Sequence, residues 1–264
     1  MDNIPVVIRR KASLDEGDLV WTIDFGSHRV DGLFHEHLFV QRCCGRFRDR
    51  AFLHYVDKSS SSHKIDLIQR ALNTSSRDIK MFASSWAPPA WMTTKNTTIN
   101  CSLKGSPGEE YWEALALYYS KFFDAYSKEG IDFWAMTVQN EPSKSILQTS
   151  AWQSLRLTAE QERDFVKLDL GPMMARNHPN LKIIAGDDQK SGILDRLALF
   201  EDADALKYIS GLGVHWYRDL DFFLASAGGD FDKLLSFYGK YPDIFMLATG
   251  DTCQAGSAPD QVFL

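Results

Sequence analysis

Short apolar runs alternate with amphipathic stretches along most of the chain. In the stretches between the runs, apolar residues recur at helical spacing, which predicts helices. The apolar runs are nearly continuous rather than alternating with polar residues, so we expect parallel strands covered on both faces. The pattern therefore predicts an α/β fold with strands at Ile79 to Ser84, Phe133 to Val138, Leu181 to Ala185, Leu212 to Trp216 and Ile244 to Ala248.

Two of the intervening stretches carry clear helix signals. Ser106-Pro107 should open the first helix, with Pro107 in its first turn, and Gly130 should end it. Thr158 and Gln161 have the spacing of a capping box and should begin the second helix. The side chains expected to face the core are Trp112, Leu115, Tyr119, Phe122, Phe123 and Tyr126 in the first helix, and Phe165, Leu168 and Met173 in the second.

The length and composition suit a single α/β barrel. The chain has 264 residues, of which 44% are hydrophobic and 12% aromatic, and one barrel typically needs about 250 residues. Residues 1–60 show no clear periodicity, so we treat them as a divergent N-terminal segment and residues 61–264 as the barrel domain. No repeat or linker divides the second part.

The charge and the cysteines narrow the class of function. A net charge of −6 argues against a general electrostatic attraction to nucleic acid or to anionic lipid headgroups. The four cysteines have no C-x-x-C spacing, so the sequence predicts neither a zinc site nor a dense disulfide framework. A neutral or locally polar substrate fits the charge of this chain better than nucleic acid or an anionic lipid surface does.

Three sequons would accept glycans if the chain passes through the secretory route. They begin at Asn73, Asn96 and Asn100. The first residues, M-D-N-I-P-V-V-I-R-R-K, contain no apolar run of signal-peptide length. We therefore expect any leader to lie outside this sequence.

The run from Phe133 to Pro142 carries the clearest candidate chemistry. It reads F-W-A-M-T-V-Q-N-E-P, so an apolar strand delivers Asn140 and Glu141 at its end before Pro142 stops the strand. Barrels keep their chemistry at the carboxyl ends of their strands. Cleavage of a glycosidic bond with retention needs two carboxyl groups about 5 to 5.5 Å apart, one to protonate the leaving oxygen and one to attack the sugar. Glu141 is the natural candidate for the acid/base.

Six ordered segments resemble the lysosomal glucosylceramidases of glycoside hydrolase family 30. The similarity covers about residues 60–255, and six matches in order are more specific than any single motif. The segments are M-F-A-S-S-W-A-P-P-A-W-M (81–92), S-L-K-G-S-P-G (102–108), F-W-A-M-T-V-Q-N-E-P (133–142), R-D-F-V-K-L-D-L-G-P (163–172), A-G-D-D-Q (185–189) and V-H-W-Y (214–217).

The resemblance implies a partial (β/α)8 TIM barrel that covers about strands 3 to 7 and lacks the β-sandwich domain of the family. It places Glu141 at the acid/base position and Asn140 beside it as a sugar contact. Trp86 matches an aromatic residue that packs on the bound glucose, where an indole face suits the C–H face of a sugar. The other pocket residues that the resemblance implies are Trp152 at the entrance and His215 and Tyr217 at the border.

The same resemblance implies a retaining β-glucosidase of sphingolipid metabolism that needs no metal or cofactor. Its substrate would be a glycosphingolipid or another β-glucoside, its location lysosomal or secreted, and its partners a transient membrane surface or an activator protein. Asp187 and Asp188 match a pair that should support the acid/base region through hydrogen bonds. We expect an acidic pH optimum, because Glu141 must hold a proton to release the aglycone.

The second carboxyl group departs from the pattern of the family. The strand-7 motif of the family, A-T-E-A-C or close to it, contains the nucleophilic Glu, whereas residues 248–253 read A-T-G-D-T-C. Alignment on Cys253 places Asp251 at the nucleophile position, and alignment on Ala248 and Thr249 places Gly250 there. We assign the role to Asp251, whose side chain is one methylene shorter than that of Glu.

Two alternative functions stay open. The first is an impaired or inactive truncated paralogue that keeps the sugar-binding pocket, because neither aligned position holds Glu. The second is a metal-dependent barrel hydrolase, because His35 and His37 have the H-x-H spacing of a zinc-binding strand and His215 and Asp251 could add ligands. Stoichiometric bound zinc would favour the second alternative.

Overall fold

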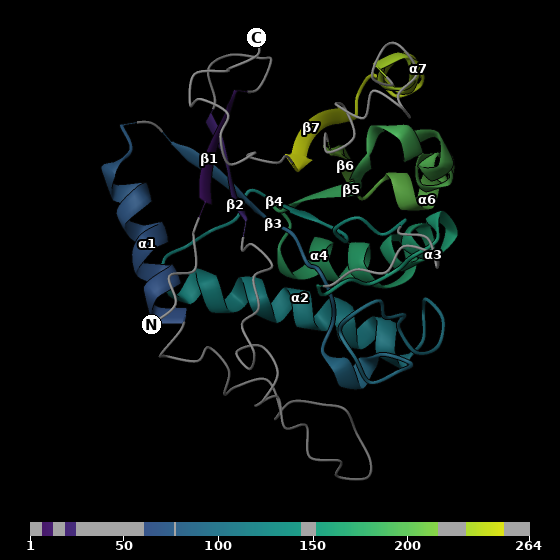
Figure 1. The fold of residues 1–264 in the computed structure, drawn as a ribbon, viewed down its shortest axis with the longest axis horizontal. Helices are drawn as coiled ribbons and strands as arrows, with labels where there is room; N and C mark the ends of the chain where they lie inside the picture. Colours follow the sequence, from purple (N-terminus) through teal and green to yellow (C-terminus); the bar gives the residue numbers. More distant parts are fainter. Residues whose placement is uncertain are drawn as a thin grey trace.

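A single sheet organises the part of the chain that the structure describes. The computed structural model describes residues 7–12, 19–24, 61–76, 78–143, 152–215 and 231–250. Within these ranges seven strands pair in chain order from β1 to β7 (Figure 1). Strands β2 to β7 are parallel, and β1 is antiparallel to β2. The strands are β1 (Val7–Ala12), β2 (Leu19–Asp24), β3 (Ile79–Ala83), β4 (Ala135–Thr137), β5 (Lys182–Gln189), β6 (Ile209–His215) and β7 (Phe245–Gly250).

The five predicted strands are confirmed as β3 to β7. They are consecutive, parallel and connected through helical segments, as in part of a TIM barrel. Strand β5 continues to Gln189, beyond the expected end at Ala185, because a bulge lets the strand resume after an irregular step. Strands β1 and β2 lie in the N-terminal segment, which we expected to be irregular. Strand β1 reads V-I-R-R-K-A, and its three consecutive basic residues interrupt the apolar run that would have predicted a strand.

The first predicted helix exists but begins later than expected. Helix α2 (Glu110–Lys128) starts after its N-cap residue Glu109, so Pro107 precedes the helix instead of lying in its first turn. The reason is Gly108, whose φ of +86° interrupts any helical path from Pro107. Gly130 ends the helix as predicted, with a φ of +74°.

The second predicted helix contains a π turn. Thr158 and Gln161 form the expected capping box at the start of α3 (Ala159–Phe165), which continues into the π-helix η2 (Val166–Leu170) and then α4 (Gly171–Asn177). The wider π turn rotates the helix face, so Leu168 is 51% exposed and its predicted core position is wrong. The other described elements are α1 (Ser61–Thr74), η1 (Ala90–Met92), η3 (Lys190–Arg196), α5 (Ala198–Glu201), α6 (Ala203–Leu206) and α7 (Phe231–Lys240).

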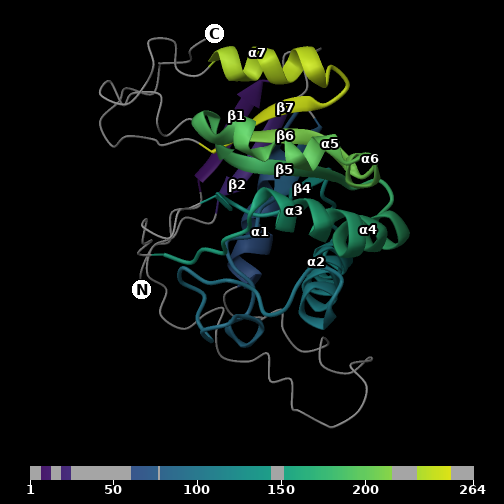
Figure 2. The ribbon, with the colours of Figure 1, turned by 90° about the vertical axis from the view of Figure 1, so that its right-hand side faces the viewer.

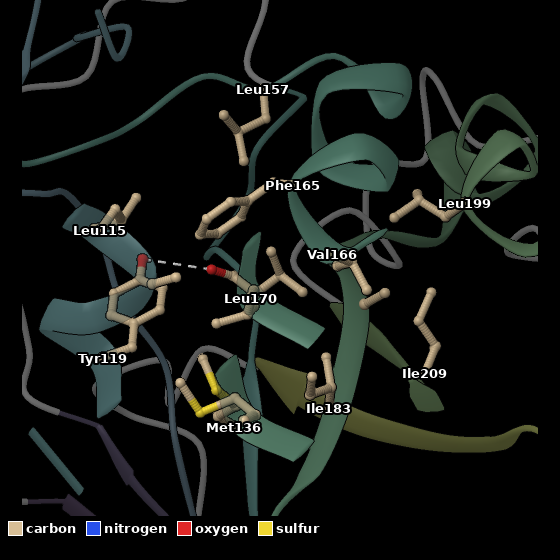
Figure 3. Packing of buried hydrophobic residues seen from close by; sticks show 14 of the residues in the cluster. Leu115, Tyr119, Met136, Leu157, Phe165, Val166, Leu170, Ile183, Leu199 and Ile209 are labelled. Carbon is tan, nitrogen blue, oxygen red and sulfur yellow. Dashed lines mark hydrogen bonds between the residues drawn. The ribbon is translucent and has the colours of Figure 1, made fainter. Parts of the chain in front are cut away.

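The main core lies between the sheet and helices α2 to α4. Figure 2 shows α2 and α4, which contact one another, on one flank of the sheet and α7 beyond β7. Trp112 and Tyr119 of α2 meet Phe165 edge-on, with ring centroids 5.4 and 6.5 Å apart. Figure 3 shows Tyr119, Phe165 and Leu170 packed together above the strands. Each fully buried side chain of this kind contributes roughly 1.5–3 kcal/mol through burial alone.

The inner face of the sheet is apolar in the middle of the strands and polar near their carboxyl ends. Phe82, Ala135 and Ile184 form part of a second buried cluster. Because side chains on one face repeat every two residues, Ser84 and Thr137 follow Phe82 and Ala135 on that inner face. The sheet therefore places polar groups where barrel enzymes have their chemistry. In the described residues, no helix is both long and apolar enough to span a membrane.

Candidate active site

Glu141 is fixed by its backbone as well as by its side chain. Its N–H donates to the carbonyl of Asp187 over 2.9 Å, and the N–H of Asn140 donates to the carbonyl of Ser85, also over 2.9 Å. Glu141 has a φ of +43°, in the left-handed region that Glu seldom adopts. These bonds connect the end of β4 to β5 on one side and to the segment after β3 on the other. They place the carboxyl group of Glu141 at the carboxyl edge of the sheet.

His215 joins two carboxyl groups. Its Nδ1 lies 3.1 Å from Oε1 of Glu141, and its Nε2 lies 3.1 Å from Oδ1 of Asp187. Burial disfavours the protonated imidazole, but Asp187 and then Glu141 outweigh it and raise the pKa of His215 to about 10. The imidazolium then donates one hydrogen bond to Oδ1 of Asp187 and one to Oε1 of Glu141. Gln189 donates a further bond from Nε2 to Oε1 of Glu141 over 3.1 Å.

Asp187 is held from the opposite side by hydroxyl groups. Ser84 donates from Oγ to Oδ2 of Asp187 over 2.9 Å and also lies 2.5 Å from Oγ1 of Thr137. Although burial opposes ionisation, the charge and hydrogen bond of His215 hold the pKa of Asp187 below its ordinary value. Gly213 faces this residue so closely that a Cβ would come within 2.8 Å of the Cα of Asp187. Only glycine therefore fits opposite Asp187 without a shift.

Asp188 supports the loop after the acid/base candidate. Its Oδ2 accepts bonds from the backbone N–H of Ser143 over 2.9 Å and from the Ser143 hydroxyl over 2.5 Å. Ser143 follows Pro142, so these bonds fix the chain just beyond Glu141. The predicted supporting role of Asp187 and Asp188 is confirmed by their hydrogen bonds to His215 and to this loop.

The other predicted site residues differ in how they are placed. Asn140 is buried beside Glu141. Trp86 is half-buried, and its carbonyl accepts bonds from Nε2 of Gln139 and from the N–H of Leu155, at 2.8 and 2.9 Å. Trp152 is 41% exposed. Tyr217, Asp251, His35 and His37 lie outside the described residues.

The parallel strands, with buried carboxyl groups at their carboxyl ends, have the arrangement of part of a TIM barrel. The family model of the glycosyl hydrolase family 30 TIM-barrel domain matches residues 49–263. The chain belongs to this family. The resemblance and the partial-barrel fold class expected from the sequence are both confirmed.

The relatives within family 30 agree with this assignment. Lysosomal acid glucosylceramidase of Mus musculus is 44% identical over 168 residues, which cover 62% of this chain and 32% of the mouse protein. Putative glucosylceramidase 4 of Caenorhabditis elegans is 37% identical, over 71% of this chain and 36% of the worm protein. The chain thus spans about a third of the length of these curated relatives.

Two solved structures match the fold over about three quarters of this chain. SrfJ from Salmonella typhimurium matches with a TM-score of 0.62 and 30% identity, over 75% of this chain and 42% of that one. The endo-β1,6-glucanase BT3312 matches with a TM-score of 0.60 and 27% identity, over 74% of this chain and 42% of that one. The relatives, which include glucosylceramidases and a glucanase, fit a glycoside hydrolase domain.

Gly250, at the end of β7, lies against His215. Strand β7 slips by one residue against β6, so that Ala248 pairs with Val214 but Gly250 pairs with His215. A Cβ on Gly250 would approach Nδ1 and Cε1 of His215 to 2.8 Å. A side chain at position 250 therefore does not fit this arrangement, and the next residue along the chain is Asp251.

Three contributors to the family 30 site were not predicted. Gln189 ends the A-G-D-D-Q motif and Ser84 lies just beyond β3. Thr137 ends β4 two residues after Ala135. Two-residue alternation from the apolar positions could have placed Ser84 and Thr137 on the inner face. No local pattern identifies Gln189, because its contact with Glu141 depends on the bulge in β5.

Proposed function

We propose that this chain is part of a retaining β-glucosidase that acts on glucosylceramide-like substrates. The observation that carries the proposal is the position of Glu141, held at the carboxyl edge of β4 by the backbone of Asp187, by His215 and by Gln189. Asp251 would be the nucleophile, immediately after Gly250 at the end of β7.

The proposed reaction uses the two carboxyl groups in turn. Asp251 attacks the anomeric carbon while Glu141 gives its proton to the glycosidic oxygen, so the aglycone leaves as an alcohol. Glu141 then takes a proton from water, which attacks the glucosyl carbon and releases Asp251 with β-glucose. His215 and Gln189 direct the carboxyl group of Glu141 through both steps.

The sugar contacts would come from residues around this pair. Asn140 lies beside Glu141 and supplies an amide for a sugar hydroxyl. Trp86 and Trp152 supply aromatic surface for the sugar ring and for the pocket entrance. His215 and Tyr217 would border the pocket. No step in this chemistry draws on a metal or another cofactor.

The substrate and location are inferred from the relatives. The mouse protein is named a lysosomal acid glucosylceramidase and the worm protein a putative glucosylceramidase. We infer a β-glucoside with a lipid aglycone, presented at a membrane surface or by an activator protein, and a lysosomal or secreted location. The three sequons suit that route.

Hydrolysis of a fluorogenic β-glucoside tests the proposal. We expect Glu141→Gln to lower kcat about 10²–10⁴-fold, but to spare the glycosylation step for dinitrophenyl β-glucoside, whose leaving group needs no proton. Asp251→Asn should abolish turnover of both substrates. NMR of the first product should show β-glucose. Equal rates for the wild type and both variants would refute the two-carboxyl assignment.

A binding function without turnover is the second candidate. The observation that favours it is Asp251, whose carboxylate stops roughly 1.5 Å short of a Glu carboxylate, and a misplacement of about 1 Å can cost on the order of a hundredfold in rate. Calorimetry with a non-hydrolysable β-glucoside distinguishes the two functions. Saturable binding without any hydrolysis would support the binding protein, and measurable hydrolysis that Glu141→Gln removes would support the enzyme.

A further inference from the structure

A buried ion pair lies behind the site, between helix α3 and η3. Oε2 of Glu162 is 3.1 Å from Nη1 of Arg196, and the two side chains are 0% and 4% exposed. Burial raises the pKa of Glu162 to about 7, against the opposing effects of Arg196 and the Gly186 N–H. Buried pairs of this kind seldom add much net stability over an apolar pair. The ion pair by itself therefore gives Glu162 little effect on the stability of the fold.

The other oxygen of Glu162 binds the sheet. Oε1 accepts the N–H of Gly186 over 2.9 Å, in the buried centre of β5. Arg196 in turn donates from Nη2 to the carbonyl of Leu157 over 3.0 Å, just before α3. The guanidinium thus fixes the direction of the carboxylate, and the carboxylate fixes one backbone amide of β5.

That amide belongs to the bulge that aims the site. Against β6, strand β5 has Gly186 and Asp187 opposite the single residue Gly213. Gly186 and Asp187 have φ values of +85° and +47°, so both leave the ordinary strand conformation. A buried N–H without an acceptor destabilises the conformation that leaves it unpaired. Glu162 supplies that acceptor and so favours the bulged conformation.

We propose that Glu162 is a positioning residue: by accepting the Gly186 N–H it holds the β5 bulge that directs Asp187 to His215, and through His215 it orients Glu141. The chain of contacts runs from Gly186 to Asp187 along the backbone, then to His215 and Glu141 at 3.1 Å each. Glu162 is on the helix side of the sheet and acts only through these residues.

Two double variants separate this role from ordinary stabilisation. Glu162→Gln/Arg196→Met removes both charges but keeps an amide oxygen for Gly186. Glu162→Met/Arg196→Met removes both charges and that oxygen. Neither variant leaves an unpaired buried charge, so they differ chiefly in the bond to Gly186. Glu201→Gln/Lys240→Met breaks an exposed pair and serves as the control for charge removal.

The readout is the NMR titration of the His215 imidazole, identified by loss of its signal in His215→Gln. Asp187 and Glu141 are the charged groups that contact this ring in the described residues. We expect the Glu162→Gln/Arg196→Met variant and the exposed-pair control to titrate like the wild type. In the Glu162→Met/Arg196→Met variant the pKa of His215 should fall by about 1 or more, because Asp187 moves away.

Kinetics give a second readout, which rests on the proposed glycosidase function. We expect kcat to fall about tenfold to a hundredfold in the Glu162→Met/Arg196→Met variant, with a smaller change in KM, and to recover in the variant that carries Gln. If the wild type hydrolyses no β-glucoside, the proposed function fails while the NMR titration still tests the positioning role.

An unchanged His215 titration in the folded Glu162→Met/Arg196→Met variant would overturn the proposal. So would equal losses in both double variants, which would assign the effect to the charges. If that variant does not fold, Glu162→Asn/Arg196→Met replaces it, because its amide is one methylene too short to reach Gly186. A wild-type titration in that folded variant would overturn the proposal equally.

Discussion

Gly250 lies directly against the imidazole ring of His215. A Cβ at position 250 would come within 2.8 Å of Nδ1, the atom that contacts Glu141. The contact therefore links the end of β7 to the acid/base candidate on β4. Even the methyl group of an alanine at position 250 would press against the ring.

We expect Gly250→Ala to displace His215 and to destabilise the protein by about 1–3 kcal/mol, as overpacking does. Activity should fall with it, because His215 orients Glu141. Urea unfolding and hydrolysis of a fluorogenic β-glucoside measure the two effects. Gly192→Ala is the matched control, since a Cβ at Gly192 meets nothing within 4 Å. Equal effects of the two changes would contradict the packing argument.

We expect a longer acidic side chain at position 251 to be tolerated and to raise the rate of hydrolysis. Asp251→Glu restores the missing methylene, so we expect hydrolysis to rise about tenfold to a hundredfold. Gly250→Glu should not raise it, because the ring of His215 occupies the space that its Cβ needs. Comparison of the kcat values of the two variants with that of the wild type tests which position supplies the nucleophile. A more active Gly250→Glu would show that the other alignment is correct.

The stability of the protein should depend on the charge of His215. Its pKa is raised from 6.5 to about 10 on folding, so protonation favours the folded state. This contribution is complete below about pH 6.5 and is lost as the pH rises through about 10. Because the pKa of Asp187 is lowered, its own contribution is lost only as the pH falls below the ordinary value of 3.8.

We therefore expect His215→Gln to cost a few kcal/mol, on the order of 2–4, at mildly acidic pH, and progressively less as the pH approaches 10. Denaturant unfolding of the wild type and the variant across this range measures the difference. His178→Gln, at a partly exposed histidine that hydrogen-bonds Ser120, is the control. A pH-independent difference between wild type and His215→Gln would count against the charged imidazole.

The π turn in the second helix makes a packing prediction. Phe165 is fully buried, whereas Leu168 is 51% exposed. Phe165→Ala should lower the free energy of unfolding by about 3–5 kcal/mol, and Leu168→Ala by less than about 1 kcal/mol. Comparable losses measured by urea unfolding would mean that the helix keeps its regular periodicity in solution.

Much of the framework followed from the sequence because it depends on local patterns. The apolar runs located β3 to β7, and Thr158 and Gln161 located the start of α3. Glu141 could be predicted as the acid/base candidate because the strand pattern and the N-E-P signal coincide. Leu168 could not be placed correctly, since the pattern was interpreted with a regular helical period that the π turn does not follow.

The contacts of the site could not be derived in the same way. Gly186 and Asp187 appeared to follow the end of a strand, but the strand continues through a bulge that only its pairing with β6 reveals. The contacts of His215 join groups 74 and 28 residues away along the chain. Such pairings depend on the register of β4 to β6, which no single segment specifies.

Glu141 and Asp187 share an uncommon backbone, with φ values of +43° and +47°. Left-handed geometry costs a residue with a side chain roughly 1–2 kcal/mol, and glycine would avoid most of it. The backbone at Glu141 and Asp187 therefore costs the protein some stability, and it directs the two acidic side chains. Glycine at either position would relax the backbone, but it would also remove a carboxyl group that contacts His215.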